Sequence, residues 1–156
     1  MEYSIRLAEK EDIKDLLDVR NNEDLLITYL NQQENKEVYL LVAEMDRSII
    51  LGFGLLKLKG NLYPKLSDLY VNEKYRGHGI GSNLIRQREK MASKLGYSEI
   101  FVSVDPIENP KMIKLITKLG YKQITEPYSK TARFHNEDGI AYEKTYTRID
   151  LKKSLN

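Results

Sequence analysis

A short glycine-rich segment constrains this chain more than any other part of it. Residues 69–71 are largely apolar and typical of a strand, and residues 80–95 carry apolar side chains at helical spacing. Between them, Gly77, Gly79 and Gly81 occupy alternate positions. Glycine lets backbone N–H groups turn inward without a Cβ clash, and the first turn of a helix leaves N–H groups unpaired at its positive end. The segment therefore predicts a strand–loop–helix unit with an anion site, whose usual ligand is phosphate.

Three patterns of phosphate-binding loop can be compared with this segment. The P-loop requires a lysine after its last glycine, and here Ser82 follows Gly81. The dinucleotide fingerprint has two residues between its second and third glycines, whereas only Ile80 separates Gly79 from Gly81. The third pattern, Arg-x-x-Gly-x-Gly, fits from Arg76 to Gly81. With the strand before it and the helix after it, this pattern resembles the acetyl-CoA signature of the GNAT superfamily of N-acetyltransferases.

The resemblance implies how residues around the loop would bind acetyl-CoA. Backbone N–H groups of the preceding strand would hold the pantetheine arm and polarise the thioester carbonyl, as the donors of an oxyanion hole do. The strand residues in that role are Leu69, Tyr70 and Val71, and the loop residues that would hold the pyrophosphate are Arg76, Gly77, His78, Gly79, Ile80, Gly81 and Ser82. His78, at a variable position of the loop, would lie in solvent or against the phosphates.

A second segment, residues 109–121, also resembles the family, in which such a helix begins with an asparagine and ends in a glycine and an aromatic residue. The family's asparagine contacts pantetheine, so the resemblance implies that Asn109 and Met112 bind the cofactor. Asn109 followed by Pro110 is equally an ordinary helix start. Both interpretations stay open, because one residue can serve both purposes.

Acetyl transfer to an amine needs a base, because an ammonium with a pKa near 10 is mostly protonated at neutral pH. Asp68 lies one residue before the expected thioester contact, and many relatives have an acid there or one residue earlier, where this chain has Ser67. Strand alternation places Asp68 and Tyr70 on one face and Leu69 on the other. Asp68 is therefore the candidate catalytic base, and the alternative is a carboxylate that anchors the neighbouring loop.

The usual general acid of the family is missing. Many relatives have a tyrosine seven residues after the asparagine, where it can protonate the leaving thiolate, and this chain has Ile116. A thiol has a pKa near 8.5, so its thiolate can also leave unaided. Other phenols that could reach the sulfur are Tyr70, Tyr128, Tyr142 and Tyr146.

Composition narrows the function classes. The 156 residues suit one domain, and a net charge of +2 gives no reason to expect nucleic acid as a partner. The absence of cysteine excludes a cysteine acyl-enzyme and thiolate metal sites and suits the cytoplasm. His78 and His135 are too far apart in sequence for a metal motif, so no metal is expected. No apolar run approaches ~18 residues, so neither a membrane span nor a membrane partner is expected.

The spacing of apolar residues and the positions of glycine and proline predict alternating strands and helices. The expected strands are residues 4–7, 38–43, 49–58, 65–72, 99–104, 121–125 and 140–151, and the expected helices are residues 9–21, 24–30, 80–95 and 110–119. Gly52 and Gly54 indicate a bulge or a close backbone approach. Arg88 is expected on the solvent side of its helix, and the polar residues 126–139 in a loop or distorted hairpin.

The order β-α-α-β-β-β-α-β-α-β-β is that of the GNAT fold. We therefore expect an α/β fold, with residues 1–156 forming a single N-acetyltransferase domain whose mixed, mostly antiparallel sheet is flanked by helices. Relatives often dimerise through C-terminal strands, so the resemblance implies a homodimer.

The expected function is transfer of an acetyl group from acetyl-CoA to a primary amine by direct attack in a ternary complex. A covalent acyl-enzyme is not favoured, because the chain has no cysteine and no obvious activated serine. The acceptor is expected to be a small amine, with the diamine acetyltransferases as the nearest resemblance, and the alternative acceptor is a protein N-terminus or lysine. An alternative that is not an enzyme is a non-catalytic acyl-CoA sensor. This alternative is favoured by Ile116, which stands where many relatives have the tyrosine that acts as general acid.

Overall fold

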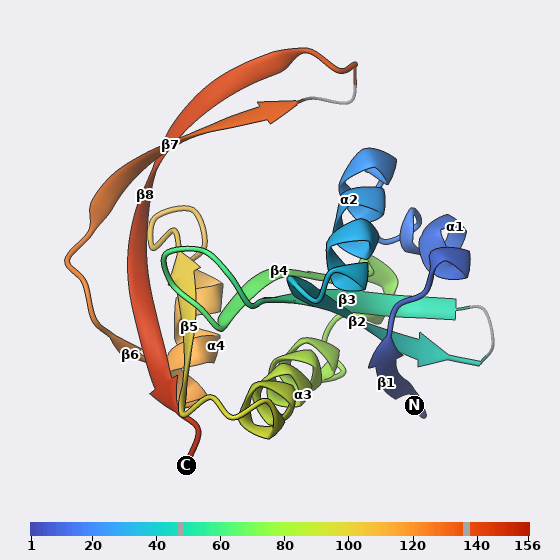
Figure 1. Ribbon diagram of the computed structural model, residues 1–156, viewed down its shortest axis with the longest axis horizontal. Helices are drawn as coiled ribbons and strands as arrows, with labels where there is room; N and C mark the ends of the chain where they lie inside the picture. The colour runs from blue at the N-terminus through green and yellow to red at the C-terminus, as the bar shows by residue number, and fades with distance from the viewer. Residues whose placement is uncertain (47–48, 136–137) are drawn as a thin grey trace. The chain divides into compact units, whose positions relative to one another are not determined.

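The computed structural model describes residues 1–46, 49–135 and 138–156. These residues form two compact units, of which one comprises Met1–Ile100 and Leu155–Asn156 and the other Phe101–Ser154. Figure 1 labels the helices and strands of both units. In the described ranges, no helix is long and apolar enough to cross a membrane.

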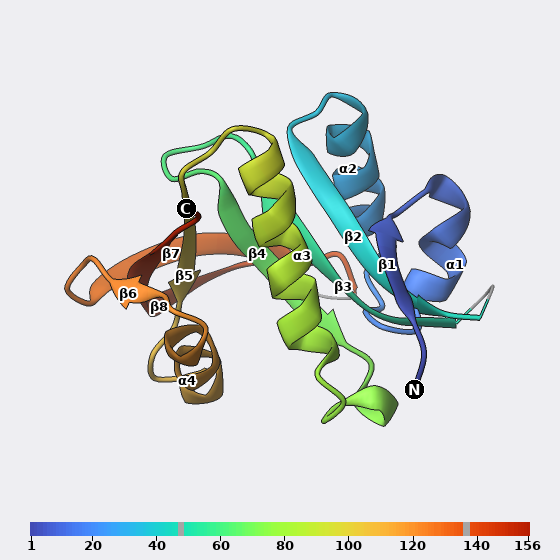
Figure 2. The same cartoon turned by 90° about the horizontal axis from the view of Figure 1, so that it is seen from below.

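The first unit contains an antiparallel sheet with strands in the order β1-β2-β3-β4. Its strands are β1 (Ser4–Leu7), β2 (Val38–Met45), β3 (Ile49–Lys57) and β4 (Lys65–Val71), and its helices are α1 (Ile13–Leu16), α2 (Glu23–Glu34) and α3 (Ile80–Lys94). Short 3-10 turns at Lys10–Asp12 and Glu73–Tyr75 precede α1 and α3. Helices α1 and α2 cover one face of this sheet and α3 covers the other (Figure 2).

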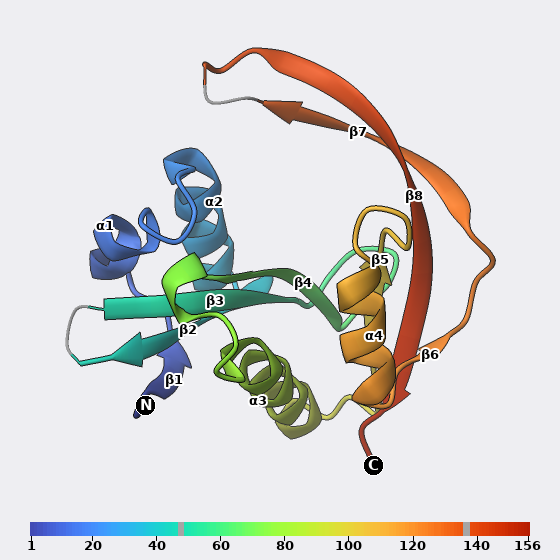
Figure 3. The same cartoon turned by 180° about the vertical axis from the view of Figure 1, so that it is seen from behind.

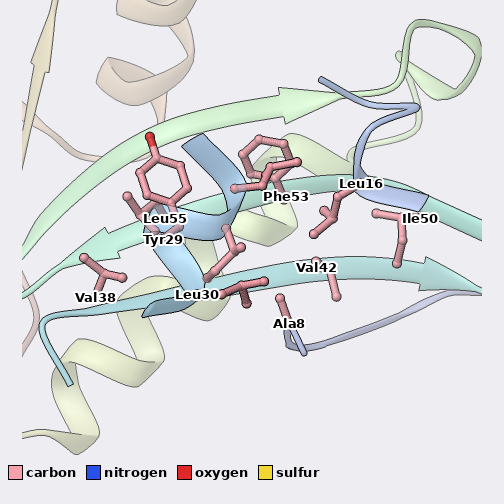
Figure 4. Close-up of a cluster of buried hydrophobic side chains, with 11 residues drawn as sticks. Ala8, Leu16, Tyr29, Leu30, Val38, Val42, Ile50, Phe53 and Leu55 are labelled. Atoms are coloured by element: carbon pink, nitrogen blue, oxygen red, sulfur yellow. The ribbon is translucent and has the colours of Figure 1, made fainter. Parts of the chain in front are cut away.

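Two hydrophobic clusters hold these layers together, one on each face of the sheet. Leu40 and Val42 of β2 belong to the cluster under α1 and α2, whereas Leu41 and Ala43 belong to the cluster under α3. Figure 4 shows Val42 within the first cluster. Successive side chains of a strand point to opposite faces, so a strand that is covered on both sides is apolar at nearly every position. The sequence prediction of a doubly buried strand is thus confirmed.

Both glycines of β3 lie where the strand register shifts or where another chain segment comes close. Gly54 pairs with Leu69 while Leu55 pairs with Ser67, so Asp68 is the one extra residue of β4 between these two pairs. A Cβ at Gly52 would lie 2.6 Å from the carbonyl oxygen of Tyr70. The sequence prediction of a bulge or close approach at this strand is confirmed.

Helix boundaries in the first unit differ from the expected ones. The segment expected as one helix over residues 9–21 contains a 3-10 turn and the short α1, and α2 extends beyond residue 30 to Glu34. Residues 31–34 are polar and carry no apolar periodicity. The Gln33 amide nevertheless donates to Ala8 O at 2.9 Å and accepts from Leu40 N at 2.7 Å. These non-local bonds stabilise the last turn, and local periodicity does not reveal them.

The second unit is built around a long hairpin (Figure 3). It holds α4 (Pro110–Lys118), β6 (Lys122–Gln123), β7 (Tyr128–His135), β8 (Ala141–Ser154) and most of β5 (Glu99–Val104). Strand β8 pairs with β6 and β7. Of the two alternatives expected for residues 126–139, the loop is wrong for residues 128–135 and the hairpin is confirmed there, while residues 136–137 lie outside the described part. Cross-strand aromatic contacts such as Phe134 on Tyr142, with ring centroids 5.7 Å apart, support this strand.

An ion-pair network at the start of the chain should contribute measurably to stability. Arg6 donates two hydrogen bonds of 2.8 Å to Asp12 and one of 2.6 Å to Glu44. Asp12 also accepts from the backbone N–H of Glu9 at 2.7 Å. The hydrogen bond from Arg6, together with that from Glu9, holds the pKa of Asp12 below its ordinary value. The carboxylate therefore stabilises the folded state in its charged form.

Asp12→Asn is expected to lower the free energy of unfolding by about 2 kcal/mol at pH 7, the range for hydrogen bonds to charged groups. Because the folded pKa is depressed, the contribution is complete above the ordinary value of 3.8 and is lost as pH falls through the folded pKa. Urea unfolding at pH 7 and at a pH below the folded pKa of Asp12 measures both effects. The control is Glu34→Gln, which breaks the exposed pair with Lys10. An Asp12 effect that persists undiminished in acid would contradict this account.

Candidate active site

The end of β4 divides its side chains between the two faces of the sheet. Tyr70 packs against the cluster under α1 and α2, whereas Leu69 and Val71 pack against the cluster under α3. Asp68 contacts Tyr29 and Arg20, which also lie on the α1 and α2 side. Asp68 and Tyr70 thus share one face, as strand alternation predicted.

Asp68 is held in a strained and polar position. Its φ is +27°, in the left-handed region that an L residue rarely adopts. The phenol of Tyr29 donates a hydrogen bond to Oδ2, and Nη1 of Arg20 lies 3.4 Å from the same oxygen. Figure 4 shows the Tyr29 ring among the apolar side chains with its hydroxyl pointing towards β4. The carboxylate therefore has a fixed direction at the bulge, which suits both a base and an anchor.

Tyr70 completes this cluster. Its ring stacks on Phe53 with centroids 5.5 Å apart, and the guanidinium of Arg20 lies 4.4 Å over its face. Burial raises the pKa of the Tyr70 phenol, the positive charge of Arg20 opposes this, and the negative charge of Asp68 adds to it. The phenol is therefore protonated at neutral pH and can donate a hydrogen bond, while its raised pKa makes it a weaker proton donor than a free phenol.

The glycine loop forms an exposed turn at the start of α3. Gly77 and Gly79 have φ values of +85° and +78°, and a Cβ at either position would meet nothing within 4 Å. Gly79 caps α3, whose first turn contains no acidic residue. Arg76 Nε donates to Val71 O at 3.2 Å, which ties the loop to the end of β4. His78 is exposed. The loop thus offers unshielded N–H groups and a cation to an anion.

The sequence pattern placed Arg88 on the solvent side of α3, and the structure shows that this expectation is wrong. The Arg88 side chain is buried, with 1% exposed, and donates to the carbonyl oxygens of Leu55, Ser67 and Leu84. The helical pattern placed Arg88 with the polar residues Arg86 and Glu89. Such a pattern cannot reveal that backbone carbonyls of the sheet are available to a charged side chain.

The remaining candidates lie in the second unit. Asn109 is the N-cap residue of α4 and Pro110 takes the first helical position, but the Asn109 side chain makes no capping hydrogen bond. Asn109 is exposed and Met112 is half-buried. The expectation that Asn109 starts the helix is confirmed, and its side chain makes no hydrogen bond that caps the helix.

Among the four phenols considered as acids, Tyr70 shares a unit with Asp68 and the others lie in the second unit. Tyr128 donates to Asp150 at 2.6 Å. Burial and that hydrogen bond raise the pKa of Tyr128. Tyr142 stacks on Phe134, and Tyr146 lies under the guanidinium of Arg148 at 4.6 Å. In the described residues, no group of three or more His, Cys, Asp or Glu side chains could hold a metal ion.

Ile116 is fully buried at the position of the missing tyrosine. Ile116→Tyr is expected to destabilise the fold by about 1–3 kcal/mol, because a larger polar side chain must fit a filled core. Urea unfolding measures this effect, and Lys114→Tyr, at an exposed position of the same helix, is the control. A variant of unchanged stability with a faster acetyl transfer would contradict the expectation.

Comparison with known proteins places this geometry in a family. Residues 5–121 match the acetyltransferase (GNAT) family. The thialysine N-epsilon-acetyltransferase of Sus scrofa is 33% identical over 106 residues, which are 60% of this chain and 61% of that protein. The chain thus matches under two thirds of the length of this curated relative.

Solved structures show the same α/β fold. An N-acetyltransferase from Staphylococcus aureus Mu50 has a TM-score of 0.75 and 21% identity, with 100% of both chains covered. The PaiA N-acetyltransferase from Thermoplasma acidophilum, in complex with coenzyme A, has a TM-score of 0.72 and 20% identity, with 99% of both chains covered. The expected α/β GNAT fold is confirmed, and from its match over residues 5–121 the chain belongs to the acetyltransferase (GNAT) family.

Proposed function

We propose that this protein transfers the acetyl group of acetyl-CoA to a small primary amine by direct attack within a ternary complex. The observation that carries the proposal is the run from Asp68 to Ser82, in which a fixed carboxylate, a bulged strand end and an exposed glycine loop follow one another. Family membership supports acetyl-CoA as the co-substrate, and a relative of the same fold was solved with coenzyme A.

The pyrophosphate would bind the N–H groups of residues 77–82 and the guanidinium of Arg76. This loop is exposed, a Cβ at Gly77 or Gly79 would meet nothing within 4 Å, and the hydrogen bond of Arg76 to Val71 O uses its Nε. The same helix start concentrates positive potential at the loop. In the second unit, Asn109 and Met112 are proposed to contact the pantetheine arm, because the Asn109 side chain has no local hydrogen bond at the helix start.

The reaction would proceed at the end of β4. Backbone N–H groups of residues 69–71 would polarise the thioester carbonyl, and donors of this kind contribute roughly 3–4 kcal/mol each in other enzymes. Asp68 would accept a proton from the acceptor ammonium, directly or through water. The amine lone pair then attacks the thioester carbon, and the carbon–sulfur bond breaks with its electron pair on sulfur. The thiolate would take a proton from Tyr70 or water, and the second proton that the nitrogen loses as the amide forms would restore that donor through water.

A small amine is favoured over a peptide as acceptor. The relative from Sus scrofa is named for acetylation of the ε-nitrogen of thialysine. A second candidate function is a non-catalytic acyl-CoA sensor, which is favoured by the buried Ile116 at the position of the family's general acid. A cytoplasmic location and a homodimer stay predictions from the sequence.

Release of free thiol from acetyl-CoA tests these alternatives when diamines, lysine, thialysine and peptides are offered as acceptors. Turnover is expected with small amines, and mass spectrometry of the product should show acetylation at nitrogen. A strong preference for peptides would overturn the small-amine proposal. Binding of acetyl-CoA without turnover on any acceptor would favour the sensor.

A further inference from the structure

Arg88 of α3 is a charged side chain buried in the core of the first unit. We propose that Arg88 is a positioning residue for acetyl transfer, because its guanidinium, packed against Gly54, holds the β4 bulge that presents Asp68. This inference rests on the proposed function. It adds a residue outside the glycine loop and the strand end to the machinery of the reaction.

The hydrogen bonds of Arg88 converge on the residue pair beside the bulge. Nη1 donates to Leu55 O at 2.8 Å and to Ser67 O at 2.9 Å, and Nε donates to Leu84 O at 3.1 Å. Leu55 and Ser67 pair across β3 and β4, immediately before the extra residue Asp68. A bulge interrupts the ladder of backbone hydrogen bonds. Arg88 supplies donors from a side chain at that point.

Gly54 provides the space for this arrangement. A Cβ there would lie 2.7 Å from Cζ of Arg88 and 2.8 Å from its Nε, closer than van der Waals contact allows. Gly54 pairs with Leu69, the residue on the other side of the bulge. The guanidinium therefore contacts the pair before Asp68 through hydrogen bonds and the pair after it through packing.

A structural role alone does not account for a charge at this position. Neighbouring positions of α3 that face the sheet are filled by Leu84, Ile85 and Ala92. Burying a guanidinium costs desolvation energy, whereas an apolar side chain would fill the same core without it. The strained φ of Asp68 also persists only where its surroundings over-determine it. The hydrogen bonds to the bulge are what an apolar residue could not provide.

The bulge decides where catalytic groups point. The bulge sets the face of the sheet and the position along β4 at which Asp68 contacts Arg20 and Tyr29. The N–H groups of residues 69–71 follow directly after the bulge. A misplacement of about 1 Å costs roughly 10²-fold in rate. Loss of Arg88 should therefore affect the chemical step more than binding of acetyl-CoA, whose proposed pyrophosphate contacts lie in the loop and at the N-terminal end of α3, whereas Arg88 lies in the second half of that helix.

Arg88→Met, which keeps the length and apolar stem, is expected to lower kcat for the amine acceptor by roughly 10–100-fold. The dissociation constant of acetyl-CoA should stay within about threefold of wild type. Arg88→Lys, which retains a charge and a donor, should recover part of kcat, and Gly54→Ala should lower kcat as Arg88→Met does. Arg86→Met, at an exposed position of α3, is the matched control and should match wild type.

The proposal is overturned if folded Arg88→Met keeps the wild-type kcat, or if kcat and acetyl-CoA affinity fall in parallel. Should Arg88→Met fail to fold, Arg88→Lys and Gly54→Ala decide by the same two readouts. A wild-type protein without turnover on any amine refutes the proposed function instead. In that case amide chemical shifts decide: in Arg88→Lys, those of Asp68 and Leu69 should move while that of Gly79 stays, and unchanged shifts at Asp68 overturn the positioning role.

Discussion

Asp68→Asn should lower kcat for acetylation of a small amine by roughly 10²–10⁴-fold, the usual contribution of a general base. Asparagine has almost the same shape as aspartate, but its amide cannot accept the proton of the acceptor ammonium. The affinity for acetyl-CoA should change little, because the proposed pyrophosphate contacts lie in residues 76–82. Thiol-release kinetics and calorimetric titration of acetyl-CoA measure the two quantities separately.

Tyr29→Phe distinguishes the two roles considered for Asp68. It removes the phenol that donates to Oδ2 and leaves the carboxylate in place. If Asp68 is the base, Tyr29→Phe should cost far less in kcat than Asp68→Asn. Equal losses in both variants would contradict the base and favour an anchoring carboxylate, because both variants disturb the same hydrogen bond.

Gly79→Ala should weaken acetyl-CoA binding by about 5–30-fold. Gly79 has a φ of +78° at the N-cap of α3. An L residue in this conformation costs about 1–2 kcal/mol, and about 1.4 kcal/mol corresponds to a tenfold change in affinity. The loop either retains the strain or relaxes away from the shape that exposes its N–H groups. Calorimetric titration of acetyl-CoA into the variant measures the loss.

Gly139→Ala is the matched control for this effect. Gly139 has the same φ of +78°, and a Cβ there would likewise meet nothing within 4 Å. Both variants should lose similar stability, and only Gly79→Ala should lose affinity for acetyl-CoA. A Gly79 variant that binds acetyl-CoA like Gly139→Ala would contradict a role of this loop in binding.

The features that local rules determine were predictable from the sequence. A glycine cap before an amphipathic stretch gave α3 its start at Ile80, and the apolar run in β2 indicated burial on both faces. The shared face of Asp68 and Tyr70 followed from the period of a strand. These predictions depend on neighbours within a few residues, and the structure agrees with them.

The features that depend on distant partners were not predictable. The burial of Arg88 depends on carbonyl groups of two strands, and the polar end of α2 depends on backbone groups of Ala8 and Leu40. Strand β7 is polar and largely exposed, so no apolar alternation marks it. The glycines of β3 did indicate a bulge, but which residue it would displace depends on the pairing with β4.

The most direct measurement of the central claim is a titration of ¹⁵N-labelled protein with acetyl-CoA, followed through backbone amide chemical shifts. The amides of Gly77, Gly79 and Gly81, together with those of residues 69–71, should show the largest changes, because a bound diphosphate accepts their hydrogen bonds and the thioester lies beside the strand. Changes confined to other parts of the chain, or no change at saturating acetyl-CoA, would contradict the account.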